Sequence, residues 1–329
     1  MNTLGVDLGG TNIKVALVDA TGNILREGSR PTNLPRPAEA VCDDIAALCR
    51  EVAGNDPVAG VGIGCPGTVE DATGTVLYSN NLAWSNFAMG PYLQAKLGLP
   101  VCLANDANAA AYGEALAGCA KGAHSAVILT LGTGVGGGVV IEGKLLTGYT
   151  GAAAELGHMV IRDTEDAPLC TCGRRGDLEA YASATALIRR TREAMAAHPE
   201  SKLWQLAPGL EDVTGRTAFD GRDAGDAVAV EVVNAYVHDL AVGVANLINI
   251  FFPEVIGLAT RLRHTHARTA VIGLSGGIAN QGEALLAPLR AEAEPLVFGA
   301  DFAKKKTRIT TCTLGYRAGV IGAALLARN

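Results

Sequence analysis

Short apolar runs that alternate with glycine turns open the chain and predict antiparallel strands. The runs at 3–7 and 12–18 flank Gly9-Gly10, and residues 19–23 have the chemistry of a hairpin turn before a third run at 24–29. A helical pattern at 37–52, a buried strand at 58–63, a second helix and a short strand at 101–104 follow. This order of elements predicts an α/β fold.

The same pattern begins again further along the chain. An apolar run at 126–131, the turn Gly132-Thr133-Gly134 and a run at 135–141 repeat the opening hairpin, so that Thr130 falls on Asp7. A duplicated hairpin is typical of a two-lobed, pseudo-symmetric fold. Any strand–glycine–strand unit has a similar appearance, however, so the repeat alone leaves both interpretations open.

The second half of the chain is mostly helical. Apolar residues recur at steps of three and four from Val230 to Leu247, which predicts a buried helix face, and Pro253 ends this helix. A further strand is expected at 270–274, and a last helix at about 315–327.

Composition and charge exclude several classes of protein. Of the 329 residues, 49% are hydrophobic and 18% charged, which excludes a disordered chain. The net charge of −6 argues against a nucleic-acid partner and against an anionic membrane. The start of the chain has no secretory pattern, so the eight cysteines are expected to be mostly reduced core thiols of a cytoplasmic protein.

The first glycine turn has the residues of a phosphate-binding turn. In the segment from Asp7 to Lys14, glycines allow backbone N–H groups to approach an anion, and Thr11 and Lys14 can add donors. Asp7 can hold Mg²⁺ through water, because that ion prefers carboxylate and phosphate oxygens. An ordinary hairpin is the alternative, but further glycine turns at 132–138 and 275–277 favour a nucleotide site to which two lobes contribute residues. None of these turns follows the P-loop pattern.

Asp106 follows the short strand at 101–104 and begins an alanine-rich stretch. The purely structural interpretation is a capping residue for the next helix. The functional interpretation is a general base at the carboxyl end of a strand, where α/β sheets present their ligands. A hydroxyl that attacks a γ-phosphate needs such a carboxylate to accept its proton.

A third group of polar residues has the composition of a metal site. His158, Cys170 and Cys172 are zinc-type ligands, and Asp177 can supply an oxygen as the fourth. Two loop thiols beside a polar histidine are the alternative. Acidic residues in the same segments, Glu155 and Glu179, can accept hydrogen bonds from a polyhydroxylated ligand.

Together these motifs resemble the ROK family (repressors, open reading frames and kinases), and within it the bacterial glucokinase-like sugar kinases. The resemblance covers nearly the whole chain and rests on segments in a fixed order: DLGGTNIK (7–14), GIGCPG (62–67), NDANAAAYGE (105–114), LGTGVGGG (131–138), ELGH (155–158), CTCGRRGDLE (170–179) and LSGGIAN (274–280). It implies an actin-like ATPase fold of two ribonuclease H-like lobes, with an active-site cleft between the lobes. We expect a small lobe at 1–115 plus 312–329 and a large lobe at 116–311.

The resemblance also implies roles for individual residues. Asp106 matches the catalytic base, and the matching sugar-binding positions are Asn81, Asn105, Asp106, Glu155, His158 and Glu179. The nucleotide-binding positions are Gly9, Gly10, Thr11, Asn12, Lys14, Gly132, Thr133, Gly134, Gly276 and Gly277. Asp7 is expected to hold Mg²⁺ indirectly, and the zinc ligands are His158, Cys170, Cys172 and Asp177.

Two segments depart from the family pattern. The family's zinc loop usually has a third cysteine where this chain has Asp177, which puts zinc occupancy in question. About fifteen extra residues, rich in Arg and His, stand near 258–272, and we interpret them as a surface insertion.

The expected function is ATP-dependent phosphorylation of a hexose at its 6-hydroxyl, with glucose as the expected sugar. Fructose, mannose, allose and N-acetylhexosamines remain alternative substrates, and polyphosphate remains an alternative donor. A sugar-responsive repressor is a poor alternative, because only a few residues precede Asp7 and the chain is acidic. A non-catalytic sugar sensor is another, although a binding-only site needs no base at Asp106. The resemblance further implies a homodimer that binds no nucleic acid and no membrane.

Overall fold

The computed structural model describes residues 1–259, 278, 281–302 and 306–328, in two compact units. Unit 1 comprises 1–128, 137–154 and the C-terminal stretch from Cys312, and unit 2 comprises 129–136 and 155–311. The strand expected at 270–274, most of the insertion near 258–272, and Gly276 and Gly277 lie outside the described residues.

Unit 1 is built on a five-stranded sheet of order β3-β2-β1-β4-β8. Its strands are β1 (Asn2–Leu8), β2 (Asn12–Val18), β3 (Ile24–Pro31), β4 (Val58–Cys65) and β8 (Val101–Asn105). The first three pair antiparallel, and β1, β4 and β8 pair parallel. This is the arrangement expected of a ribonuclease H-like lobe, and the predicted strand positions agree with it to within two residues.

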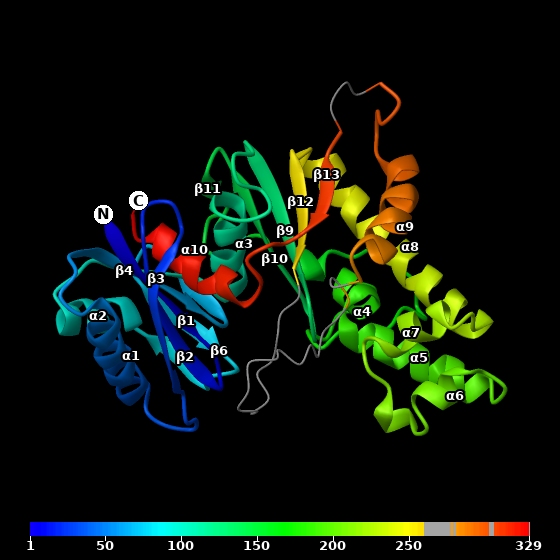
Figure 1. Ribbon diagram of the computed structural model, residues 1–329, viewed down its shortest axis with the longest axis horizontal. Coiled ribbons are helices and arrows are strands. Elements are labelled where there is room, and N and C mark those ends of the chain that lie inside the picture. Colours follow the sequence, from blue (N-terminus) through cyan, green and yellow to red (C-terminus); the bar gives the residue numbers. More distant parts are fainter. Residues whose placement is uncertain (260–277, 279–280, 303–305, 329) are drawn as a thin grey trace. The chain divides into compact units, whose positions relative to one another are not determined.

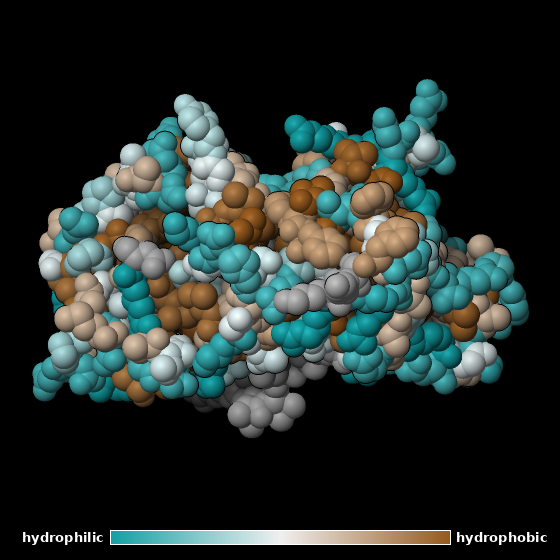
Figure 2. Space-filling view, turned by 90° about the horizontal axis from the view of Figure 1, so that it is seen from above, coloured by the Kyte–Doolittle hydropathy of each residue, from teal (hydrophilic) through white to brown (hydrophobic). Residues whose placement is uncertain are grey.

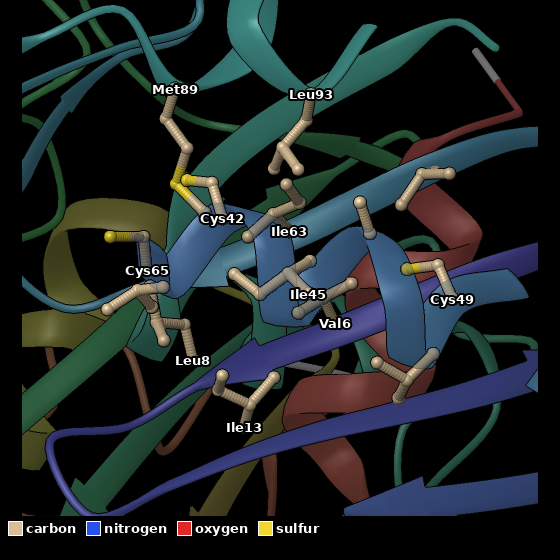
Figure 3. Packing of buried hydrophobic residues seen from close by; sticks show 14 of the residues in the cluster. Val6, Leu8, Ile13, Cys42, Ile45, Cys49, Ile63, Cys65, Met89 and Leu93 are labelled. Atoms are coloured by element: carbon tan, nitrogen blue, oxygen red, sulfur yellow. The ribbon is translucent and has the colours of Figure 1, made fainter. Parts of the chain in front are cut away.

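Helices cover both faces of this sheet (Figure 1). Helices α1 (Ala38–Ala53) and α2 (Met89–Leu97) lie on one face, and α3 (Asp106–Leu116) and α10 (Ala318–Leu326) lie on the other. Figure 3 shows the core under α1, where Cys42 and Ile45 meet Ile63 and Val6 of the sheet. These side chains are fully buried, and their close packing fixes the positions of the strands relative to α1.

A small antiparallel sheet, which the sequence pattern did not predict, lies between β4 and α2 in the chain. It consists of β5 (Thr68–Glu70), β6 (Thr75–Ser79) and β7 (Trp84–Phe87). Gly67 connects it to β4 at φ 106°, where an added Cβ would lie 2.2 Å from the Tyr78 carbonyl oxygen, so only glycine fits.

The second five-stranded sheet has the order β11-β10-β9-β12-β13, so its strands follow the same third-second-first-fourth-fifth sequence as the first sheet. Its strands are β9 (Ser125–Leu131), β10 (Val135–Ile141), β11 (Lys144–Leu145), β12 (Val255–Ala259) and β13 (Arg308–Thr311). β9 and β10 begin and end 123 residues after β1 and β2, respectively. The shared order and constant offset confirm the duplicated hairpin.

Apart from β12, β13 and the adjoining ends of β9 and β10, unit 2 is mostly helical, as predicted. It contains α4 (Leu178–Ala182), α5 (Ala184–Ala197), α6 (Leu203–Leu206), α7 (Thr217–Asp223), α8 (Ala227–Phe251) and α9 (Glu283–Ala293), with single turns at Leu156–His158 (η1), Leu210–Asp212 (η2) and Glu294–Leu296 (η4); the turn Gly315–Arg317 (η5) precedes α10 in unit 1. By length and composition, α8 is the one helix among the described residues that could cross a membrane. It packs against α4, α5, α7 and α9, and most of its apolar side chains are buried, so it is the core helix of this unit.

Candidate active site

The carboxyl ends of three parallel strands in unit 1 meet at one edge of the sheet. Asp7 of β1 pairs with Gly64 of β4, and Gly64 in turn pairs with Ala104 of β8. Neighbouring strands are about 4.8 Å apart, so the ends of β1 and β8 are about 10 Å apart. This edge therefore brings Asp7 close to Asn105 and Asp106, a spacing that suits a phosphate chain and an attacking hydroxyl.

Asn105, and not Asp106, caps helix α3. The Asn105 side-chain oxygen accepts hydrogen bonds from the N–H groups of Ala107 and Asn108 at 2.8 and 3.2 Å, and its amide donates to the Gly67 carbonyl. The capping role that the purely structural interpretation gave to Asp106 is therefore performed by Asn105.

Asp106 is the first residue of α3 and is buried, with 7% of its surface exposed. Its Oδ1 accepts a hydrogen bond from the Ala107 N–H at 2.8 Å. The first turn of a helix, where the helix dipole is positive, is a favourable place for an acidic side chain. Gly64 of β4 lets the first turn of α3 pack closely on the strand, because an added Cβ would lie 3.2 Å from the Ala109 Cβ and 3.6 Å from the Asp106 Cα.

The first glycine turn is held by hydrogen bonds from Thr32, and its tip is exposed. The buried Thr32 donates from its N–H to the Thr11 carbonyl at 2.8 Å and from its hydroxyl to the Gly9 carbonyl at 2.7 Å. Gly10 and Thr11 are exposed, and the backbone of Asn81 lies beside Gly10. The turn is therefore rigid but accessible, as an anion site on backbone N–H groups requires. No sequence signal pointed to Thr32.

Lys14 lies opposite Asp7 on β2 and places its ammonium group 5.1 Å from the ring centre of Tyr316. Burial lowers the pKa of Lys14, and the Asp7 carboxylate partly opposes that effect. On the helix side, Gly319 of α10 leaves room for the Asp7 carboxylate, because an added Cβ would lie 3.3 Å from it.

The glycine turn of unit 2 is tied to Glu179. The Val135 N–H donates to Glu179 Oε2 at 2.8 Å, and an added Cβ at Gly134 would lie 2.2 Å from the same oxygen. The other carboxylate oxygen, Oε1, accepts from the Thr171 hydroxyl at 3.0 Å. Glu179 therefore links the loop at 170–177 to the turn at 132–135. The sequence did not reveal this link, because Glu179 and Val135 are 44 residues apart.

The segment at 155–158 packs on the same turn. An added Cβ at Gly157 would lie 2.0 Å from the Val135 carbonyl, so this glycine is required for the close approach. Glu155 is exposed and precedes the single helical turn that ends at His158. The Thr133 carbonyl accepts from the hydroxyl of Thr185, while the Thr133 side chain is exposed.

The four expected zinc ligands converge in unit 2. One ligand atom from each of His158, Cys170, Cys172 and Asp177 lies within 4.8 Å of all the others. The separations from His158 Nδ1 are 3.0 Å to Asp177 Oδ2 and 3.9 Å to Cys170 Sγ, and Cys172 Sγ lies 3.5 Å from Asp177 Oδ2. Ligand atoms of a tetrahedral zinc ion are about 3.3–3.8 Å apart, so this donor set fits zinc.

Asp177 divides its carboxylate between two roles. Oδ1 accepts from the Ala180 N–H at 2.9 Å and caps α4, whereas Oδ2 faces the histidine and the cysteines. The group is fully buried; burial tends to raise its pKa, but hydrogen bonds from Cys170 and His158 prevail and hold the pKa below its usual value. An ionised oxygen is therefore presented to the cluster.

A family model described as the ROK family matches residues 3–329. The chain belongs to the ROK family. It is 37% identical to a glucokinase of Thermotoga maritima, covering 100% of this chain and 98% of that protein. It is 36% identical to a glucokinase of Streptomyces coelicolor, covering 99% of this chain and 98% of that protein.

Solved structures give the same result. The chain resembles a ROK family glucokinase from Streptomyces griseus, solved in complex with glucose and AMPPNP, with a TM-score of 0.76, 34% identity and coverage of 100% and 99% of the two chains. It also resembles a ROK hexokinase from Thermus thermophilus, with a TM-score of 0.79, 30% identity and coverage of 100% and 98%. These likenesses confirm the family and the expected actin-like fold class.

Proposed function

We propose that this chain is a hexose kinase that transfers the γ-phosphoryl group of ATP to the 6-hydroxyl of glucose, in carbohydrate metabolism. The observation that carries the proposal is the buried Asp106 at the start of α3, on the sheet edge that also holds Asp7. The family and its glucokinase relatives support the same chemistry.

Asp106 acts as the general base in this proposal. Its carboxylate accepts the proton of the sugar 6-hydroxyl as that oxygen attacks the γ-phosphorus in line. The Asn105 side chain accepts two backbone hydrogen bonds at the start of α3, and these fix the backbone that carries the Asp106 carboxylate. Asp7 is the residue that would hold Mg²⁺ through water, and the ion supplies charge neutralisation on the phosphates.

Backbone N–H groups of the two glycine turns bind the nucleotide in this proposal, with Gly9, Gly10 and Thr11 in unit 1 and Gly132, Thr133 and Gly134 in unit 2. Asn12 begins β2 directly after the first turn, and Lys14 is the third residue of that strand. Gly276 and Gly277 are also proposed as nucleotide-binding residues, on the family resemblance.

The proposed sugar-binding residues are Asn81 and Asn105 in unit 1, and Glu155, His158 and Glu179 in unit 2. We retain the expected lobes, 1–115 plus 312–329 and 116–311, as part of the proposal.

We further propose a structural zinc ion held by His158, Cys170, Cys172 and Asp177, because their ligand atoms have zinc-like separations. Protein purified without chelator is expected to contain close to one zinc per chain by elemental analysis. A content well below one would overturn the zinc proposal and leave a hydrogen-bonded His158–Asp177 pair.

The two roles of Asp177 can be separated by substitution. Asp177→Ser keeps an oxygen that can cap α4 but removes the ligand, so zinc release to a chromogenic chelator is expected to be faster than in the wild type. Asp177→Cys is expected to release zinc more slowly, while loss of the cap costs about 1 kcal/mol of stability. Equal release rates in all three proteins would show that Asp177 is not a ligand.

Glu179 is expected to affect both substrates, because its carboxylate accepts a hydrogen bond from the Val135 N–H of the glycine turn and Glu179 is also one of the proposed sugar-binding residues. Glu179→Ala should raise KM for ATP roughly tenfold, the effect of losing one charge-assisted hydrogen bond, in addition to raising KM for glucose. Glu193→Ala, a change at an exposed glutamate of the same unit, is the control and should leave both constants unchanged. A rise in KM for glucose alone would contradict this link to the nucleotide turn.

We also propose a cytoplasmic homodimer that binds neither nucleic acid nor membrane. All eight cysteines are free, which fits a reducing compartment.

For the homodimer, unit 2 exposes large apolar side chains at Ile250, Phe252 and Phe298, which a second copy could cover. On the face drawn in Figure 2, hydrophobic residues are interspersed with hydrophilic ones.

A direct test measures the sugar phosphate formed from glucose, mannose, fructose, allose and N-acetylated hexosamines, with ATP or polyphosphate as donor, and also measures ADP release where ATP is the donor. We expect ADP release from ATP that requires sugar, with kcat/KM highest for glucose. A higher kcat/KM for another hexose would change the substrate but keep the kinase. ADP release that no sugar stimulates would overturn the proposed function.

A further inference from the structure

Two cysteines far apart in the sequence lie side by side in unit 1. Cys119 follows the end of α3, Cys312 begins the stretch that leads into α10, and their sulfur atoms are 3.8 Å apart although the residues are 193 positions apart. Neither belongs to the proposed zinc cluster or to the substrate residues. Both residues are partly exposed.

One buried carboxylate fixes the backbone on both sides of this pair. Glu114 Oε2 accepts from the Cys119 N–H and from the N–H of Thr313, each at 3.0 Å, and Oε1 accepts from the Leu314 N–H at 2.7 Å. Glu114 itself has no exposed surface. The two sulfur atoms are therefore held near each other by a shared anchor, which raises their effective concentration toward each other.

A metal site is the competing interpretation of Glu114, Cys119 and Cys312, because their ligand atoms lie within 4.8 Å of one another. The Glu114 carboxylate already accepts three backbone hydrogen bonds, so a cation would have to displace them. That leaves two sulfur atoms, fewer ligands than a protein zinc site uses. The geometry favours bond formation between the sulfurs over metal binding.

We propose that Cys119 and Cys312 are a redox modification site, in which a low-molecular-weight disulfide oxidises the pair to an intramolecular disulfide that slows turnover. This inference goes beyond the proposed kinase activity, and only its effect on turnover rests on that activity.

The chemistry is thiol–disulfide exchange in two steps. The Cys119 thiolate attacks one sulfur of the oxidant, which breaks the oxidant's S–S bond, forms a mixed disulfide and releases one thiolate. Cys312 then loses its proton and attacks Cys119 Sγ, which releases the second thiolate. The two protein thiols are oxidised, the oxidant is reduced to two thiols, and these take up the two protons.

The environment indicates the order of the two steps. The hydrogen bond with Cys119, burial, and the nearby Glu114 carboxylate together raise the pKa of the Cys312 thiol well above its usual value. Cys312 is therefore assigned the second step, because little of its thiol is present as the reactive thiolate. Disulfide formation would shorten the separation of the two sulfur atoms from 3.8 Å to about 2.05 Å.

The site lies where the chain passes from unit 2 to unit 1. Unit 2 ends at Thr311, the last residue of β13, and unit 1 resumes at Cys312. A disulfide to Cys119 would remove conformational freedom from this connection. Because conformational steps often limit kcat in kinases, we expect the oxidised protein to have about one third of the reduced kcat or less.

The test is to equilibrate the full-length protein in buffers of increasing oxidised-to-reduced glutathione ratio. The thiols are then alkylated, disulfide-linked peptides are mapped by mass spectrometry, and kcat is measured with ATP and glucose. We expect a Cys119–Cys312 linked peptide to accumulate as kcat falls about three-fold, and dithiothreitol to reverse both changes. Cys119→Ser and Cys312→Ser should form no such peptide and keep their kcat, and Cys102→Ser, a cysteine outside the pair, should behave as the wild type.

Several results would overturn the inference. They are linkage mapped only to other cysteines such as Cys170 and Cys172, an equal fall of kcat in Cys119→Ser, a disulfide that leaves kcat unchanged, or a metal ion that is lost in Cys119→Ser. Absence of any sugar-dependent turnover would instead overturn the proposed function, and the peptide map would still decide whether the pair is oxidised.

Discussion

Replacing Asp106 by asparagine is expected to lower kcat for glucose phosphorylation by about 10²- to 10⁴-fold, the range typical of a lost general base. Asparagine keeps the oxygen that accepts from the Ala107 N–H, and Asn105 still caps α3, so the fold should be preserved. The glucose dissociation constant, measured by calorimetry, should change much less than kcat, because the lost proton acceptor acts in the transition state.

The matched control is Asp226→Asn, the same change at another buried aspartate at the start of a helix, here the capping residue of α8 in unit 2. It can lower the melting temperature but should leave kcat within about two-fold of the wild type, since in the part of the chain that the structure describes this carboxylate accepts hydrogen bonds from backbone N–H groups and the Ser201 hydroxyl. If Asp106→Asn retained more than about a tenth of wild-type kcat, Asp106 would not be the base.

Adding side-chain bulk at Gly10 is expected to weaken ATP binding strongly while leaving the fold intact. An added Cβ there would lie 3.6 Å from the Asn81 carbonyl, an ordinary contact, and the backbone does not require glycine. A phosphate held on the turn's N–H groups would be displaced by the same methyl group. We expect KM for ATP to rise about tenfold in Gly10→Ala and about a hundredfold in Gly10→Val, which correspond to about 1.4 and 2.7 kcal/mol.

Glucose binding to the Gly10 variants, measured without nucleotide, should be nearly unchanged. Gly215→Ala serves as the control, because its added Cβ would also make only an ordinary contact, at 3.8 Å from Ala184. Unchanged KM for ATP in a folded Gly10→Val protein would place the nucleotide elsewhere.

The hairpins and the glycine turns could be predicted because each is encoded locally. The runs at 12–18 and 135–141 each follow a glycine turn and are rich in valine and other aliphatic residues, and their ends coincide with those of β2 and β10. The sheet β5-β6-β7 could not be predicted in the same way. Its strands are short, and Tyr78 and Ser85 form an exposed cross-strand pair, so no clear alternation marks them.

The candidate site depends on contacts that no local pattern records. Asn105 and Asp106 are both good capping residues, and only the backbone conformation decides that Asn105 caps and Asp106 stands inside the helix. NDANAAAYGE carries the family resemblance, yet only the structure shows that its last residue, Glu114, holds the segment after Cys312. His158 and Asp177, in contrast, are grouped in one candidate zinc site by ligand chemistry and the family resemblance, and the structure brings those residues together.

The most direct test of the central claim is to identify the phosphorylated product by ³¹P and ¹³C NMR after incubation with ATP, Mg²⁺ and glucose, with 6-deoxyglucose as the matched sugar that lacks the 6-hydroxyl. The account predicts glucose 6-phosphate formed in step with ADP, and no product from 6-deoxyglucose. Phosphate at another position, or ADP release that is the same with 6-deoxyglucose as with glucose, would contradict it.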